Sequence, residues 1–326
     1  MRARLRRAGR FASILGAALI LGLAASAGWS QSSRTIRLIV PFPAGGSADL
    51  VARMLADEIG RAQAVSVVIE NRPGASAVLG TEAAARAAPD GNTLLISAPS
   101  LVINAHLRKV VYDPRSSFAP ICRLVSSPQI IVVNGRSPYR TLSDLLNAAR
   151  ASPGALSLAS VGPGSNSHIA FELFKRAANV DITYVPYPGN TPAINALLGE
   201  HLTSAFVDYG GAFEQIRSGQ LRALAAGSAT RIEALPEVPT LIELGLINDS
   251  NDVWFGVLAP ARTAPDTVSR LAAWFQAALQ APELRAKLVA QGLFPSAACG
   301  ADFAAFIQRQ YDEFGRVIAE AKIEAE

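Results

Sequence analysis

Short apolar runs rich in β-branched residues alternate with longer amphipathic segments along most of the chain. The runs predict strands, and several are too apolar to be half exposed, which predicts sheets covered on both faces. Between them, apolar positions recur with helical spacing, as at Leu50, Val51, Met54, Leu55 and Ile59. Alternating strands and helices predict an α/β fold with largely parallel sheets. The predicted strands are 36–40, 65–70, 93–97, 121–125, 130–133, 156–160, 182–185, 203–207, 221–226 and 254–258.

The pattern changes near residue 265, after which we expect mostly helix, over 266–280, 282–290 and 302–321. The chain has 326 residues, enough for two lobes. Two short crossings, near 127–131 and 225–228, would make the first lobe discontinuous. We therefore predict one lobe from residues 28–128 and 227–326 and a second lobe from residues 129–226.

The N-terminus has the pattern of an export signal. Five arginines without an acidic residue precede an apolar stretch from residue 11 to about residue 25, and Ala25-Ser26-Ala27 supplies small residues for cleavage near Ala27. An uncleaved membrane anchor is the alternative, although the apolar stretch is short for a span. We expect residues 1–27 to be removed and the protein to be periplasmic.

Removal of this leader changes the charge balance. The whole chain has a net charge of +4, but the mature chain would keep 25 basic and 26 acidic residues. No basic stripe remains for a nucleic-acid backbone, so no nucleic-acid partner is expected. The two cysteines, Cys122 and Cys299, are compatible with a disulfide or with two buried thiols. Three histidines without metal-ligand spacing predict neither a metal nor another cofactor.

Three glycine- and proline-rich turns, each between a predicted strand and a predicted helix, are the candidate ligand sites. The first, 40–50, carries Gly45 and Gly46, which permit a tight turn and close backbone approach, with Ser47 as the expected N-cap. The second spans 160–168, and the third spans 187–193, where Asn190 or Thr191 would cap the helix. Ligands of open α/β sheets bind beyond the carboxyl ends of strands, and helix N-termini attract anions. Two such turns from different lobes would hold a carboxylate with backbone N–H groups.

Each polar side chain near these turns has two possible roles, one structural and one in ligand binding. Asp49 either balances the helix dipole or binds a ligand amino or hydroxyl group. His168 either packs or donates to a ligand carboxylate. Asp208 either lines the cleft or caps the next helix. The turns match neither a Walker loop nor a dinucleotide fingerprint, and no Gly-x-Ser-x-Gly elbow is present.

The ordered series of motifs resembles the substrate-binding receptors of tripartite tricarboxylate transporters, the Bug proteins. The resemblance covers the chain from about residue 36 to the last helix, through Pro41-Phe42-Pro43-Ala44-Gly45-Gly46, Glu70-Asn71-Arg72-Pro73-Gly74, Gly162-Pro163-Gly164-Ser165 and Leu235-Pro236-Glu237-Val238-Pro239-Thr240. It implies a type II periplasmic binding fold, with two α/β lobes joined by two short hinge crossings around a ligand cleft. It also implies that loops 42–47 and 164–168 hold a ligand carboxylate, partly through water. The predicted ligand-binding residues are Phe42, Ala44, Gly45, Gly46, Ser47, Asp49, Ser97, Gly164, Ser165, Asn166, Ser167, His168 and Asp208.

The predicted function is therefore capture of a small organic acid or amino acid and its delivery to membrane permease subunits. The protein is expected to be monomeric and to carry out no catalysis. A ligand-binding sensor that feeds a two-component system is the alternative, and a periplasmic hydrolase is a weaker one.

Overall fold

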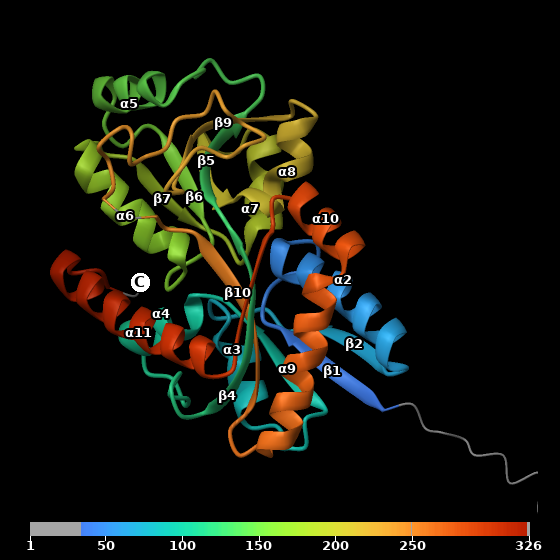
Figure 1. The fold of residues 1–326 in the computed structure, drawn as a ribbon. Helices are drawn as coiled ribbons and strands as arrows, with labels where there is room; N and C mark the ends of the chain where they lie inside the picture. Colours follow the sequence, from blue (N-terminus) through green and yellow to red (C-terminus); the bar gives the residue numbers. More distant parts are fainter. Residues whose placement is uncertain (1–33, 249, 325–326) are drawn as a thin grey trace, which may run out of the picture. The chain divides into compact units, whose positions relative to one another are not determined.

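The structure is a computed structural model that describes residues 34–248 and 250–324, so the predicted export signal lies outside the described residues. From Thr35 onward they form one unit with two β-sheets (Figure 1). The first sheet has the order β11-β4-β10-β3-β1-β2, from β1 (Thr35–Val40), β2 (Ser66–Asn71), β3 (Thr93–Ser97), β4 (Phe118–Ser127), β10 (Val253–Pro260) and β11 (Phe294–Cys299). The second has the order β7-β6-β8-β5-β9, from β5 (Gln129–Asn134), β6 (Ser157–Ser160), β7 (Thr183–Pro186), β8 (Ser204–Asp208) and β9 (Leu221–Ala226).

Helices cover both faces of each sheet. One face of the first sheet packs against α2 (Ser47–Gln63), α9 (Pro265–Gln280) and α10 (Pro282–Ala290), and the other against α3 (Val78–Ala85), α4 (Ser100–Leu107) and α11 (Ala301–Ala321). The second sheet lies between α5 (Leu142–Ala151) with α6 (Asn166–Ala178) and α7 (Asn190–Leu198) with α8 (Tyr209–Arg217). This arrangement confirms the predicted α/β class.

Alternation along the central strands explains why the predicted runs were so apolar. In β5, Ile131 and Val133 enter the core under α5 and α6, whereas Ile130 and Val132 enter the core under α7 and α8. Successive side chains of a strand point to opposite faces, so a strand with helices on both sides must be apolar at every position. All ten predicted strands are present, with ends within three residues of the expected ones.

The sheets are mixed, so the prediction of largely parallel sheets is wrong. Strands β1, β2 and β3 pair in parallel, as do β6 with β7 and β8, but β10 is antiparallel to both β3 and β4. Likewise, β5 is antiparallel to β8 and to β9. Strand β5 follows β4 across the junction of the two sheets, and β10 returns after β9. Each therefore enters its sheet from the direction opposite to that of the local β-α-β units.

The first crossing is a single residue, Pro128, between β4 and β5. The second differs from the predicted short crossing, because residues 227–252 connect β9 to β10 and most of this segment packs against the second sheet. Ile232 and Leu241 are buried in the two cores of that sheet. Backbone bonds join the two crossings: the Gly227 N–H donates to the Gln129 carbonyl at 2.7 Å, and the Asn251 N–H donates to the Gly227 carbonyl at 3.0 Å.

Strand β11 was not predicted, because the C-terminal region was expected to be mostly helical. It pairs antiparallel with β4 and places Cys299 opposite Cys122, and these two cysteines form a disulfide. The bond therefore fastens the strand between α10 and α11 to the edge of the first sheet. Within the described residues, every helix lacks the length or the hydropathy to cross a bilayer.

Candidate functional site

The first glycine-rich turn leads from β1 into α2 and is held in shape by Asp49. The Gly45 N–H and the Arg53 Nε–H each donate to Asp49 Oδ2 at 2.9 Å, and the Asn71 amide donates to Oδ1 at 3.0 Å. Burial raises the pKa of this carboxyl, but the bonds from Arg53, Gly45 and Asn71 outweigh it and leave the pKa below its usual value. The N-cap of α2 is Gly46, and Ser47 is the first helical residue. The prediction of Ser47 as the cap is thus wrong by one position.

The second turn leads from β6 into α6 and uses its own hydroxyls. Ser165 is the N-cap, and its Oγ accepts the His168 N–H at 3.1 Å and donates to the Gly162 carbonyl at 2.8 Å. Ser167 Oγ accepts the Val161 N–H at 3.1 Å. Gly164 has φ 83°, and a Cβ there would lie 2.3 Å from Asn104 Oδ1. A glycine is therefore required both by the backbone and by the close approach of α4.

Asp208 ends β8 and performs both roles considered from the sequence. It is the N-cap of α8, where its Oδ2 accepts the Gly211 N–H at 3.3 Å, and it lines a cavity. Ser47 Oγ donates to Oδ2 at 2.8 Å, and the Asn190 amide donates to both carboxylate oxygens. Burial raises the pKa of Asp208, and these bonds offset only part of the effect. The Ser47 bond joins an element of the first sheet to one of the second.

The third turn leads from β7 into α7 and touches the first turn. Its N-cap is Gly189, so the expectation of a cap at Asn190 or Thr191 is wrong. A Cβ on Gly189 would lie 2.8 Å from Pro43 Cδ. The absence of a side chain at Gly189 thus lets α7 begin directly against the first turn.

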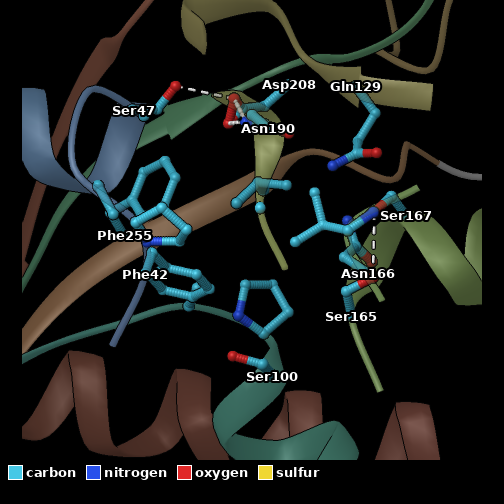
Figure 2. A pocket seen from close by; sticks show the side chains of 18 of the residues that line it. Phe42, Ser47, Ser100, Gln129, Ser165, Asn166, Ser167, Asn190, Asp208 and Phe255 are labelled. Atoms are coloured by element: carbon cyan, nitrogen blue, oxygen red, sulfur yellow. Dashed lines mark hydrogen bonds between the residues drawn. The ribbon is translucent and has the colours of Figure 1, made fainter. Parts of the chain in front are cut away.

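These turns surround one cavity with a volume of about 60 Å³ at the junction of the two sheets (Figure 2). Its lining includes seven of the predicted ligand residues: Phe42, Gly46, Ser47, Ser165, Asn166, Ser167 and Asp208. The remaining lining residues are Pro43, Ala48, Ala98, Pro99, Ser100, Gln129, Val161, Gly189, Asn190, Thr191, Val253 and Phe255.

The other predicted residues are not part of this lining. Gly45 and Asp49 shape the first turn through their mutual bond, and Ala44 is exposed in that turn. Gly164 shapes the second turn. The buried Ser97 ends β3, and the His168 ring lies 4.9 Å from the Tyr184 ring, centroid to centroid. From these positions, the residues support the two turns and do not themselves line the cavity.

Five helices begin at the cavity, because α2, α4, α6 and α7 each contribute N-terminal residues to its lining and α8 contributes its N-cap. The first N–H groups of a helix lack intrahelical partners and carry the positive end of its dipole. Two of these helices already have a carboxylate: Asp49 in the first turn of α2 and Asp208 at the N-cap of α8. No acidic residue occupies the first turn of α4, α6 or α7. At α4, however, the Leu101 and Val102 N–H groups already donate to the Ala98 and Pro99 carbonyls. The starts of α6 and α7 therefore remain available to an anion.

Residues 51–323 match the sequence profile of the tripartite tricarboxylate transporter family receptor. The chain belongs to this receptor family. It is 35% identical to protein BugT of Bordetella pertussis over 291 residues, 88% of this chain and 89% of that protein. The structure of the periplasmic binding protein BugD superposes with a TM-score of 0.86 and 31% identity, over 90% of this chain and 99% of BugD. MatC from Rhodopseudomonas palustris with bound malate superposes with a TM-score of 0.82 and 29% identity, over 87% of this chain and 99% of MatC.

The receptor's cavity includes residues that sequence reasoning missed. Gln129 follows the first crossing, and Phe255 lies in β10 just after the second. Ser100 begins α4. Gln129 is a polar residue directly before the apolar run of β5, and this position was a signal that the sequence contained. Phe255 gave no comparable signal, because an aromatic residue in a buried strand is usually part of the core.

Proposed function

We propose that this receptor captures a small carboxylate in the cavity between its two sheets and delivers it to membrane permease subunits. The observation that carries the proposal is the convergence of the starts of α6 and α7 on one cavity, each without an acidic residue in its first turn. Backbone amides at these N-termini are suited to an anion, and hydrogen bonds to a charged acceptor contribute about 1.5–3 kcal/mol each. The malate-bound relative supports the same ligand class.

The predicted division into lobes becomes part of this proposal, with one change. The first lobe comprises the first sheet and its helices. The second comprises the second sheet together with residues 227–248, since Ile232 and Leu241 lie in its cores. The crossings at Pro128 and near Asn251 then act as the hinge on which the lobes close around the ligand.

Export and the absence of catalysis complete the proposal. Residues 1–27 would direct the chain to the periplasm and be cleaved, in keeping with the periplasmic BugD. The hydroxyls of Ser165 and Ser167 bond to backbone groups of their own turn, which supports a structural use of these serines rather than a nucleophilic one.

A thermal-shift screen against small carboxylates and their matched amides tests the proposal. A ligand at 100 times its dissociation constant stabilises the native state by about 2.7 kcal/mol, a rise of a few degrees in Tm. We expect shifts with carboxylates and none with the amides, and no product by mass spectrometry after incubation. Mass spectrometry of the denatured protein identifies any ligand that co-purifies. A protein free of ligand that responds to no carboxylate would refute the proposal.

A further inference from the structure

Helix α4 packs on the first sheet and also contacts the second turn, which belongs to the second sheet. Ser100, its first residue, lines the cavity (Figure 2). Asn104 and the C-cap residue Arg108 follow at intervals of four, so they continue the same side of the helix. Neither is part of the lining. These two residues can nevertheless influence a bound ligand through the turn that they touch.

Arg108 contacts the second turn through its guanidinium group. Its Nη2 donates to the Pro163 carbonyl at 3.0 Å and would lie 3.4 Å from a Cβ on Gly164. Its Nε is buried and has no hydrogen-bond partner among the described residues. Hydrogen bonds from a charged donor are stronger than those between neutral groups. The bond to Pro163 therefore joins the first sheet's side to the second turn by a strong contact outside the cavity.

Asn104 fits α4 to the same turn. Its side chain is fully buried, and its amide donates to the Ser100 and Ser76 carbonyls, each at 2.9 Å. Its Oδ1 would lie 2.3 Å from a Cβ on Gly164, so helix and turn meet where the turn lacks a side chain. A Cβ on Gly162 would lie 3.0 Å from Ser76 Oγ. The second turn is thus held on the first sheet's side by α4 and by the loop that contains Ser76.

This loop has an unusual backbone. Ala75, Ser76 and Ala77 have φ of 46°, 52° and 79°, which places three successive non-glycine residues in the left-handed region. Such conformations cost free energy and persist where surrounding contacts hold them. The bond from Asn104 to the Ser76 carbonyl is such a contact. Substitution of Asn104 would therefore disturb the loop as well as the turn, so Arg108 is the better residue to test.

We propose that Arg108 is a positioning residue for ligand capture, which holds the second turn against α4 and stabilises the closed arrangement of the lobes. This inference rests on the proposed function and its hinge, and it adds a determinant of affinity outside the cavity lining. Arg108 belongs to the first lobe and Pro163 to the second, so their bond breaks when the lobes separate. The apparent dissociation constant rises as the population of the binding-competent state falls. Loss of the bond should therefore weaken the binding of every ligand by the same factor.

Calorimetric titration of the purified, ligand-free protein with butyrate, succinate, malate and adipate tests this inference. The variants are Arg108→Ala and Arg108→Met, of which the second keeps a long apolar stem. Both should bind each acid that the wild type binds about tenfold or more weakly, by one factor for monocarboxylates and dicarboxylates. Arg285→Ala, at an exposed position on α10, removes the same charge and should change no affinity. Thermal melts followed by circular dichroism establish that each variant is folded.

Four results would contradict this reasoning. A loss below about threefold in both variants would overturn the inference and leave the proposed function intact. A loss in Arg108→Ala alone would indicate a packing role for the stem, and a loss that grows with the charge of the acid would indicate a direct electrostatic effect on the ligand; either would overturn the inference. A wild type that binds none of the acids would overturn the proposed function as well.

Stopped-flow kinetics with the tightest-binding of these acids separates closure from attraction of the ligand. In the proposed hinge motion the ligand enters the open arrangement, where the bond between Arg108 and Pro163 is absent. The variants should therefore lose affinity through faster dissociation, with an association rate within about twofold of the wild type. A loss confined to the association rate and abolished by added salt would indicate steering of the anion by the Arg108 charge and would overturn the inference.

Discussion

Replacement of Gly46 by valine should block ligand capture and leave the protein folded. Gly46 has φ −86° and ψ 172°, an extended conformation that any residue adopts. A Cβ there would lie 3.8 Å from the Pro43 carbonyl oxygen and 3.8 Å from Thr191 Oγ1, an ordinary contact distance. The added isopropyl group would enter the cavity between the starts of α2 and α7. The adjacent Gly45, with φ 80°, would instead be strained by any side chain.

The magnitudes follow from these positions. Loss of glycine from a compatible site stabilises by about 0.4–1 kcal/mol through the unfolded chain, and valine is a poorer N-cap than glycine by a similar amount. The free energy of unfolding should therefore change by less than about 1 kcal/mol. Overpacking typically costs about 1–3 kcal/mol. Here the cost would reduce the binding free energy of the ligand, which corresponds to a loss of affinity of about 5- to 150-fold.

Calorimetric titration with the carboxylate found by screening, together with thermal melts followed by circular dichroism, measures both quantities. Gly46→Ala is the graded control and should lose less affinity than the valine variant. Gly45→Val should lower Tm as well as affinity, because its cost falls on the backbone. A Gly46→Val protein with a native melt and unchanged affinity would refute the role of the first turn in the cavity.

Three further perturbations test other parts of the structure. Cys122→Ser with Cys299→Ser should lower the free energy of unfolding by up to about 5 kcal/mol, because the bridge spans 177 residues, and chemical denaturation should show this against untreated and reduced wild type. Asp208→Asn should change the pH dependence of stability: the raised pKa of Asp208 means that the wild type loses stability as pH rises from about 4 through that pKa, a slope that the variant should lack in parallel melts. Asp49→Ala should destabilise by about 1–3 kcal/mol and weaken ligand binding, since it removes the acceptor of Gly45, and identical melts would contradict this role.

The sequence predicted the parts of the fold that depend on local pattern. Strand β5 is an example, because each residue from Ile130 to Val133 enters a core on one face or the other. Strand β11 escaped prediction because Phe294–Cys299 contains a proline and small residues and is only half buried throughout. Its pairing with β4 spans most of the chain and is reinforced by the Cys122–Cys299 disulfide, neither of which local propensity can report.

The sequence predicted those residues of the candidate site that belong to glycine-rich turns. Gly45 and Gly164 mark turns whose backbone conformation suits glycine, so these signals are local. Gln129 and Phe255 became lining residues only because two crossings, distant in sequence, meet at the junction of the sheets. The direction of β5 and β10 arises from the same crossings. A pattern of strands and helices contains no information on which strand returns from another sheet.

Placement of the cavity at the junction has a consequence for how a ligand would act. A ligand shifts a conformational equilibrium only by its differential affinity for the two states. Asn166 and Gln129 belong to α6 and β5 of the second sheet's side, whereas Phe42 and Phe255 lie on the first sheet's side. Under the proposed hinge motion, a ligand would contact both groups at once only when the lobes are close. In that proposed motion, the contacts made with the second group would be absent from the open state and would contribute to closure. A molecule that binds at the start of α6 without reaching Phe42 and Phe255 should therefore stabilise the closed state least.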